Sequence, residues 1–139
     1  MRFTPEHARL ANGFIADTLV QHLGIEFLTD EDGHFCATMP VDKRTHQPMG
    51  LLHGGATAAL AESLGSMGSA IIADPKTHNV VGIEINANHI RGVTSGQVMA
   101  RGTLLHAGRT THVWDMKVTD DRDRLVAVCR LTVLIVPRK

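Results

Sequence analysis

The sequence predicts an α+β protein in which one curved antiparallel sheet wraps around a single long central helix. An apolar segment with helical periodicity, residues 54–73, follows two short extended runs and precedes four more. Turns too short for parallel crossovers join the last three runs, so the sheet is expected to be antiparallel. A sheet and a helix of this kind can bury each other's apolar faces if the sheet curls around the helix. The 139 residues are expected to form one domain, 1–139.

The composition excludes several classes of partner. Lys plus Arg and Asp plus Glu each number 14, so the formal net charge is zero. No basic excess indicates nucleic acid or an anionic membrane surface, although a few local arginines can still bind an acidic small ligand. The two cysteines, Cys36 and Cys129, lack CxxC spacing. A reduced protein of the cytoplasm is therefore expected.

The segment from Leu51 to Ala73 is the one stretch apolar enough to suggest a membrane span. It contains His53, Glu62 and several small polar residues. A carboxylate near the middle of a span costs about 2.5–3.5 kcal/mol on insertion scales. The first twenty residues are charged within the first ten positions and lack the unbroken apolar core of a signal peptide. No membrane span is expected.

The elements before the long helix are predicted from periodicity and turn residues. An amphipathic helix is expected from Pro5 to about Leu19. The stretch GIEFLTDEDGHFCATMPV, residues 24–41, places two apolar runs around the turn-forming DEDG and predicts a hairpin. The stretch DKRTHQPMG, residues 42–50, contains a proline and a glycine and predicts a loop.

Four extended runs after the helix are expected to complete the sheet. The turn-forming stretches RGVTS, AGR and DDRD separate them. In the third run, the residues from His112 to Val118 alternate between two faces, and Trp114 is expected in the core. The four runs are VVGIEINANHI (80–90), GQVMARGTLLHA (96–107), TTHVWDMKVT (110–119) and RLVAVCRLTVLIV (124–136).

The predicted helix has two contrasting faces. The stripe expected in the core consists of Ala56, Leu60, Leu64, Met67 and Ile71. The opposite stripe consists of small residues around one acid: Gly55, Ala58, Ala59, Glu62, Ser66 and Ser69. Small residues let another backbone approach closely, and Glu62 and Ser66 are neighbours one turn apart. Glu62 is either a simple exposed acid or a functional one. Because nothing else on this stripe looks solvated, the functional interpretation is favoured.

The helix begins with the glycines of HGG, residues 53–55. Free N–H groups at a helix N-terminus stabilise a developing anion, and glycine lets a ligand carbonyl approach them; ordinary loop glycines are the alternative. Gly54 and Glu62 lie about 12 Å apart along one helix, so one reacting carbonyl cannot contact both. If both serve one reaction, Glu62 must come from a second, antiparallel copy. This predicts a twofold homodimer with shared active sites.

Three stretches carry a family resemblance: MPVDKRTHQPMGLLHGGATAALAESLGSMGSA (39–70), VVGIEINANHIR (80–91) and LLHAGRTTHVW (104–114). Together they resemble the hotdog-fold acyl-CoA thioesterases of the PaaI-like family. The likeness is strongest to hydrolases of 1,4-dihydroxy-2-naphthoyl-CoA and to the enterobactin proofreading thioesterase. It implies the hotdog fold and the hydrolysis of an aroyl- or arylacetyl-CoA thioester to the free acid and CoA. A thioesterase that proofreads an aryl carrier protein is the alternative.

The resemblance also implies catalytic roles. The backbone N–H of Gly54 would donate to the thioester oxygen as an oxyanion hole. Gln47 and His53 would orient and polarise that carbonyl. Glu62 of the partner subunit would be the nucleophile or general base, and Ser66 would position the water or substrate beside it.

The same resemblance implies where coenzyme A binds. It would lie along the first strand after the helix and contact two pairs of basic residues. The implied contacts are backbone groups near Val81 and Gly82 for the pantetheine arm, His89 and Arg91 towards the nucleotide, and His106 and Arg109 near its phosphates. Arginine matches phosphate geometry, but ordinary polar residues at strand ends are the alternative. Coenzyme A is part of the substrate, so no separate cofactor is expected. Relatives also imply a homotetramer.

Two other kinds of function fit less well. The nine histidines show no HExxH or HxH spacing, so no metal site is expected. A hotdog module that binds acyl-CoA without hydrolysing it has no reason to keep Glu62 together with Gln47 and Gly54.

Overall fold

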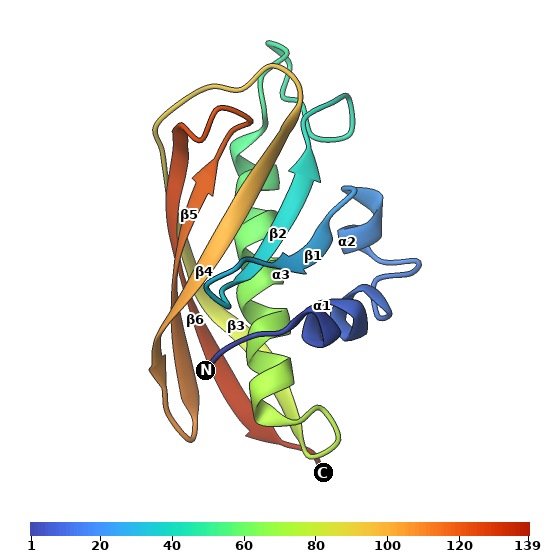
Figure 1. Cartoon of the computed structure of the whole chain (residues 1–139), viewed down its shortest axis with the longest axis vertical. Helices are drawn as coiled ribbons and strands as arrows, with labels where there is room; N and C mark the ends of the chain where they lie inside the picture. The colour runs from blue at the N-terminus through green and yellow to red at the C-terminus, as the bar shows by residue number, and fades with distance from the viewer.

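The computed structural model describes residues 1–139 and confirms the predicted sheet around a helix. Helices α1 (Pro5–Asn12) and α2 (Leu19–His22) precede strands β1 (Glu26–Thr29) and β2 (Phe35–Pro40). The long helix α3 (Gly54–Ala73) follows. The remaining strands are β3 (His78–His89), β4 (Gln97–Ala107), β5 (Thr111–Thr119) and β6 (Leu125–Pro137). In Figure 1, α3 runs along the inside of the curved sheet.

The six strands form one antiparallel sheet in the order β1-β2-β4-β5-β6-β3. The twelve-residue strand β3 is therefore an edge strand. Its pairing with β6 is interrupted by a bulge between Gly82 and Glu84, and the β4–β5 pairing by another between Leu104 and His106. Bulges bend a strand and increase its local twist, which suits a sheet that curves around α3.

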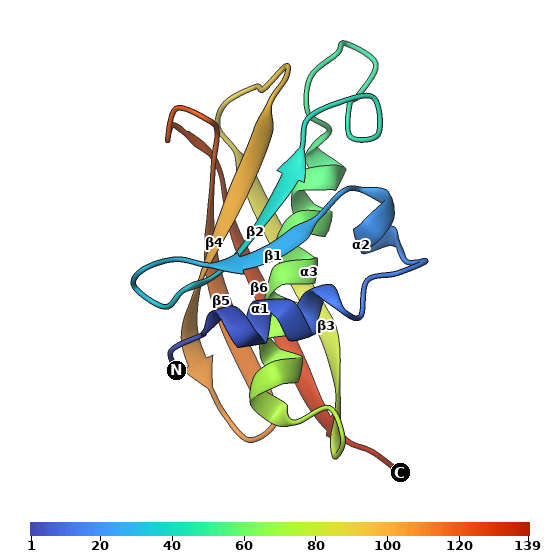
Figure 2. The ribbon, with the colours of Figure 1, turned by 45° about the vertical axis from the view of Figure 1, so that its right-hand side comes forward.

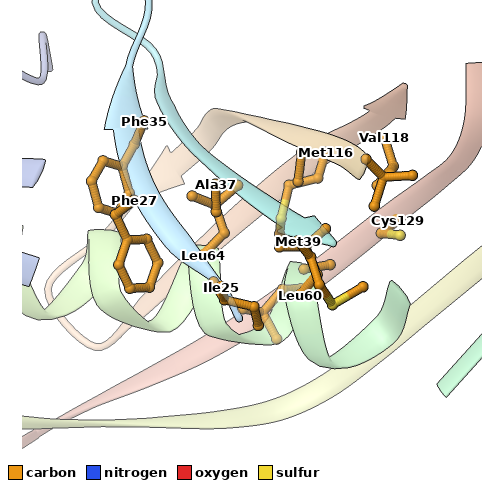
Figure 3. Close-up of a cluster of buried hydrophobic side chains, with 14 of the residues drawn as sticks. Ile25, Phe27, Phe35, Ala37, Met39, Leu60, Leu64, Met116, Val118 and Cys129 are labelled. Carbon is orange, nitrogen blue, oxygen red and sulfur yellow. The ribbon is translucent and has the colours of Figure 1, made fainter. Parts of the chain in front are cut away.

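The core lies between α3 and the concave face of the sheet. Leu60 and Leu64 of α3 point towards side chains of β2, β5 and β6, among them Met39, Met116 and Cys129 (Figure 3). In β5, the alternation predicted from the sequence is confirmed, because Trp114 and Met116 are fully buried. Each large apolar side chain buried here stabilises the fold by about 1.5–3 kcal/mol.

Trp114 fixes the position of α3 against the sheet. Its indole packs directly on the helix backbone, since a β-carbon at Gly68 would lie 2.7 Å from the ring atoms Cη2 and Cζ2. The indole Nε1–H also donates to Ser69 Oγ at 2.9 Å, and His112 Nδ1 lies 2.9 Å from the same oxygen. Burial, together with nearby His106, lowers the pKa of His112, so the network favours the neutral imidazole.

The core face of α3 is rotated from the predicted stripe. Leu60 and Leu64 are buried as expected, but Met67 and Ile71 are only partly buried. Ser69, which the periodicity placed beside Glu62, is fully buried. Glycines of α3 face the sheet and large side chains of the sheet fill the space above them. A pattern based on large apolar residues of the helix therefore misses the true core face.

The N-terminal segment differs from the single helix predicted from Pro5 to about Leu19. Helix α1 ends at Asn12, whose side chain exchanges two hydrogen bonds with the backbone of Phe27 at 2.8 and 2.9 Å. Asp17, with φ 60°, then turns the chain before α2. Figure 2 shows α1 running crosswise to α3 on the side of β1. The tertiary contact of Asn12 stops the helix where local periodicity would continue it.

Helix α3 is long and apolar enough, by length and composition, to cross a membrane. The core helix of a soluble protein satisfies the same criteria. Residues of α3 such as Leu60, Ala61 and Leu64 are fully buried inside the fold. Packing against the sheet accounts for the apolar composition of this helix.

We expect Gly68→Ala to destabilise the protein by about 1–3 kcal/mol, because the new methyl group overpacks the contact with Trp114. The loss should appear although alanine gains about 1 kcal/mol over glycine in helix propensity. Urea unfolding measures the difference. Gly92→Ala is the control, since a β-carbon there meets Leu51 Cδ2 at an ordinary 3.4 Å. Equal stability of the Gly68→Ala and wild-type proteins would contradict the packing described here.

Candidate active site

Two separate cavities flank the exposed side of α3. The first, here called the Glu62 cavity, has a volume of about 370 Å³ and is lined by Ala58, Ala59, Glu62, Gly82, Ile83, Glu84 and Ile85. The second, here called the Gly54 cavity, has a volume of about 190 Å³ and is lined by Gln47, Leu51, Leu52, Gly54, Thr57, His89, Ile90, Arg91, Gly92 and Val126. One lies beside the middle of β3 and the other beside its end.

The Glu62 carboxylate lies half-buried between α3 and β3. It rests against the backbone of Gly82, where a β-carbon would lie 2.0 Å from Glu62 Oε1. A side chain at this point of the strand would displace the carboxylate from this position. Burial raises the pKa of Glu62, and no hydrogen bond or nearby cation of the chain offsets this effect. A carboxylate in this state is suited to accept a proton or to attack a carbonyl carbon.

The Gly54 cavity contains the N-terminus of α3. The His53 carbonyl accepts hydrogen bonds from the N–H groups of Ala56 and Thr57, at 3.0 and 3.2 Å. His53 Nδ1 caps the helix by accepting the Gly55 N–H at 2.7 Å. The Gly54 N–H has no acceptor within the chain. It is a free donor at the positive end of a 20-residue helix, which suits an anionic oxygen.

Gln47 is held in the same cavity by a tight turn. Its N–H donates to the Leu51 carbonyl at 2.8 Å, and its carbonyl accepts from Gly50 at 3.0 Å. Gly50 has φ 80°, a conformation that glycine adopts without strain. The side-chain Oε1 of Gln47 accepts the Met49 N–H. Its Nε2 group has no acceptor within the chain, and Gln47 lines the cavity, so this donor is available to a ligand there.

The segment after β3 is tied to this turn. The Leu52 N–H donates to the Val93 carbonyl at 2.8 Å, and His46 Nε2 lies 3.0 Å from the Thr94 carbonyl. These contacts bring the end of β3 onto the start of α3. As a result, the His89 imidazole covers Gly54, where a β-carbon would lie 3.0 Å from His89 Nε2.

The five predicted catalytic residues fall in four places. Gln47 and Gly54 share one cavity, whereas Glu62 lines the other. His53 caps α3 and is exposed, and it does not line the Gly54 cavity. Ser66 is half-buried one turn beyond Glu62. Gly54 and Glu62 lie on the same helix α3, whose rise of about 1.5 Å per residue separates them by about 12 Å.

The residues predicted to bind coenzyme A are also distributed over the fold. Gly82 contacts Glu62, and Val81 beside it is 49% exposed on the edge strand. His89 and Arg91 line the Gly54 cavity. His106 and Arg109 lie at the β4–β5 turn, at the opposite end of the sheet (Figure 1). One chain does not bring the two basic pairs together.

One cluster of side chains that could bind a metal ion lies outside both cavities. Asp30, Asp32 and His34 offer ligand atoms within 4.8 Å of one another at the β1–β2 turn. The Asp30 carboxylate already bonds His34 Nδ1 and Arg101 Nε, each at 2.9 Å. These contacts explain the cluster as part of the hairpin.

Sequence reasoning missed two contacts of the site. The sequence predicts a backbone role for Gly82 in binding coenzyme A, and the structure adds its contact with Glu62. A glycine inside a strand often marks the close approach of another group, and that signal was available. The position of His89 above Gly54 has no local signal, because it depends on how β3 ends against α3.

The chain is similar to proteins of one family over most of its length. The family model described as Thioesterase superfamily matches residues 49–127. A thioesterase from Pseudomonas aeruginosa is 48% identical over 136 residues, which are 98% of this chain and 93% of that protein. The proofreading thioesterase EntH of Klebsiella pneumoniae is 48% identical over 120 residues, 86% of this chain and 87% of that protein.

Solved structures show the same similarity. The crystal structure of a mutant of the P. aeruginosa thioesterase matches with a TM-score of 0.90 and 46% identity, covering 94% of both chains. A Staphylococcus aureus protein matches with a TM-score of 0.82 and 41% identity, covering 86% of this chain and 99% of that one. These matches confirm the predicted fold.

We expect Glu62→Gln to stabilise the protein at neutral pH. The unfolded chain ionises Glu62 near the ordinary pKa of 4.5, whereas burial raises the pKa in the folded state. Stability is therefore lost as the pH rises from about 4.5 through the folded-state pKa, and it stays lost above it. Glutamine removes this cost, so the melting temperature should rise at pH 7–8 and be unchanged near pH 4.

The matched control is Glu26→Gln, which removes the same charge from an exposed position on β1. It should leave the melting temperature nearly unchanged at both pH values. If Glu62→Gln shifted the melting temperature equally at pH 4 and pH 8, ionisation would not be the cause.

Proposed function

The chain belongs to the thioesterase superfamily, and we propose that the thioester it hydrolyses is an aromatic acyl-CoA. An aroyl- or arylacetyl-CoA such as 1,4-dihydroxy-2-naphthoyl-CoA would give the free acid and CoA. The observation that carries thioester hydrolysis is the pairing of two incomplete half-sites on one helix, and the resemblance to hydrolases of 1,4-dihydroxy-2-naphthoyl-CoA favours the aromatic acyl group. One half offers free donors at Gly54 and Gln47, and the other offers the unpaired carboxylate of Glu62.

The donor half suits the thioester carbonyl. The Gly54 N–H and the Gln47 side-chain amide would both point at the oxygen as negative charge develops on it. Two preorganised donors of this kind stabilise the tetrahedral intermediate because they need no reorganisation during the reaction. His53 supports the arrangement by capping the helix at Gly55 and so presenting the free N–H of Gly54.

The carboxylate half suits the attack on the carbonyl carbon. Glu62 would either attack directly, giving an anhydride that water then hydrolyses, or take a proton from an attacking water. The C–S bond breaks and the sulfur leaves with the electron pair. Ser66, one helical turn away, would position the water or the substrate. Neither route requires a metal or a cofactor beyond the coenzyme A of the substrate.

A twofold dimer would unite the halves. The half-exposed small residues Ala58 and Ala59 of α3 adjoin the edge strand β3, where Ile83 is 55% exposed. A second chain lying antiparallel on this surface would place its Glu62 beside Gly54 of the first, and the twofold axis would repeat the arrangement. Such a partner would pair an open strand edge and cover apolar side chains.

The same dimer would gather the coenzyme A contacts. His89 and Arg91 lie at the α3 N-terminal end of one chain, and His106 and Arg109 lie at the opposite end. An antiparallel partner would bring its β4–β5 turn, which carries its own His106 and Arg109, towards His89 and Arg91 of the first chain. Arg91, His106 and Arg109 would then surround the nucleotide, and His89 would lie between it and Gly54. The pantetheine arm would run along β3 near Val81 and Gly82.

A homotetramer would use the outer face of the sheet. Leu105 and Val136 are 52% and 36% exposed, and Val113 and Leu134 are half-buried. Val113 pairs with His106 of β4, and Leu134 pairs with Thr111 of β5. Two dimers that pack these faces together would remove this apolar surface from water. We also propose that the enzyme acts in the cytoplasm.

Variants of the S. aureus protein support the assignment of Gln47 and Glu62. Its crystal structures include one with a glutamine and one with a glutamate replaced by alanine, fifteen positions apart. Gln47 and Glu62 have the same separation in this chain. The correspondence favours a shared role for this pair.

A thioester on an aryl carrier protein is the second candidate substrate. The observation that favours it is the similarity to EntH of K. pneumoniae, a protein named as a proofreading thioesterase. In this case the substrate would present the same pantetheine arm and thioester, attached to a protein surface in place of the nucleotide.

We expect thiol release from benzoyl-, phenylacetyl- or dihydroxynaphthoyl-CoA to exceed release from fatty acyl-CoA in kcat/KM. Glu62→Ala should lower kcat by about 10²–10⁴-fold. A thiol-trapping dye measures both, with an aryl carrier-protein thioester as a parallel substrate. Preference for fatty acyl-CoA would contradict the aromatic assignment, and full activity of Glu62→Ala would contradict the mechanism.

Subunit mixing tests the shared site. Gln47→Ala and Glu62→Ala proteins should each be nearly inactive, but each mixed dimer would contain one site with both native residues. Mixed dimers should therefore show about half of the wild-type rate. Differently tagged chains, purified as mixed dimers, provide the measurement. Inactive mixed dimers would show that each chain supplies its own Glu62.

A further inference from the structure

His89 occupies an unusual place for an exposed histidine. It is the last residue of β3, and its imidazole lies over the first residue of α3. A β-carbon at Gly54 would be 3.0 Å from Nε2 and 3.2 Å from Cε1 of this ring. The ring therefore lies against the α-carbon of Gly54, which is bonded to the free N–H group. No other group of the chain hydrogen-bonds the His89 side chain, so both nitrogens are available to a ligand.

The backbone around His89 is firmly held. Residue 89 pairs with Ala127 of β6, and the next two N–H groups, of Ile90 and Arg91, both donate to the Val126 carbonyl at 2.8 and 3.2 Å. A side chain at the end of a paired strand is positioned more precisely than one on a loop. The backbone from which the ring reaches Gly54 is thus fixed by the fold.

His89 is also distinguished by its chemistry. Among the residues that line the Gly54 cavity, it is the only histidine, the side chain that most often serves as a general acid or base. Arg91 stays protonated, and the Gln47 amide and the Thr57 hydroxyl do not transfer protons readily near neutral pH. His53, the neighbouring histidine, uses Nδ1 to cap the helix and lies outside the cavity.

The position of the leaving sulfur follows from the proposed function, on which this inference rests. If the thioester oxygen binds at the Gly54 N–H, the C–S bond lies within a few ångströms of that donor. The coenzyme extends from the sulfur towards Arg91, two residues beyond His89. The sulfur would then lie beside the imidazole. We propose that His89 is a catalytic residue that donates a proton to the departing sulfur of coenzyme A.

The proton transfer completes the reaction. The C–S electron pair moves to sulfur as the bond breaks, and the proton from the His89 imidazolium joins it, giving the thiol of CoA and a neutral imidazole. The oxygen of water ends in the carboxyl group of the product, and the proton lost by that water goes to Glu62. His89, which is exposed, regains a proton from solvent. No oxidant, metal or second substrate is required.

A set of three benzoyl thioesters tests this role. Benzoyl-CoA carries the nucleotide, benzoyl-N-acetylcysteamine keeps an alkyl thiol without the nucleotide, and S-benzoyl-4-nitrothiophenol has an acidic thiol that leaves without a proton. We expect His89→Gln and His89→Ala to lower kcat by about 10²-fold for the first two and to have little effect on the third. Glutamine preserves hydrogen bonding but cannot donate a proton, so it should not rescue activity.

Each other result has a distinct meaning. A loss confined to KM for benzoyl-CoA would assign His89 to nucleotide binding and overturn the proposal. Equal losses for all three thioesters, or rescue by glutamine, would assign it to carbonyl positioning and overturn it as well. Wild-type protein inactive on every thioester would overturn the proposed function and this role with it. The control His22→Gln changes an exposed histidine on α2 and should alter none of the rates.

Discussion

The rigidity of helix α3 is the constraint on which the site depends. A helix rises 1.5 Å per residue, so Gly54 and Glu62 stay about 12 Å apart whatever else moves. Trp114 holds the helix against the sheet through a contact on Gly68 and a hydrogen bond to Ser69. The separation of the donor half from the carboxylate half is therefore built into the fold, and it is the reason for the proposed second subunit.

The edge strand β3 serves both halves of the site. Its middle supplies the bare backbone of Gly82 against which the Glu62 carboxylate rests, and its end supplies the imidazole of His89 above Gly54. The cost is an unpaired strand edge with exposed apolar side chains such as Ile83. Exposed edges of this length favour association with another strand. The strand that shapes the site is thus the one most in need of a partner.

Burial without compensation gives Glu62 its chemical character. The side chain lies between α3 and β3 with no cation or hydrogen-bond donor from its own chain, which raises its pKa. By contrast, Asp30, which is also partly buried, has both His34 and Arg101 as partners. Stability would favour a similar partner for Glu62. Its absence fits a group that must remain free to react with a ligand.

The sequence by itself determined the six strands, the bounds of α3, the antiparallel pairing and the candidate pair Gly54 and Glu62. These features follow from periodicity, turn residues and the rise of a helix, all of which act over a few residues. Only the tertiary structure decided that β3 lies beside β6, that Ser69 is buried and that Asn12 ends α1. It also decided that His53 caps α3 and that His89 covers Gly54. Each of these depends on which surfaces meet, and side chains distant in sequence, such as Trp114 and Phe27, select those surfaces by packing and hydrogen bonding.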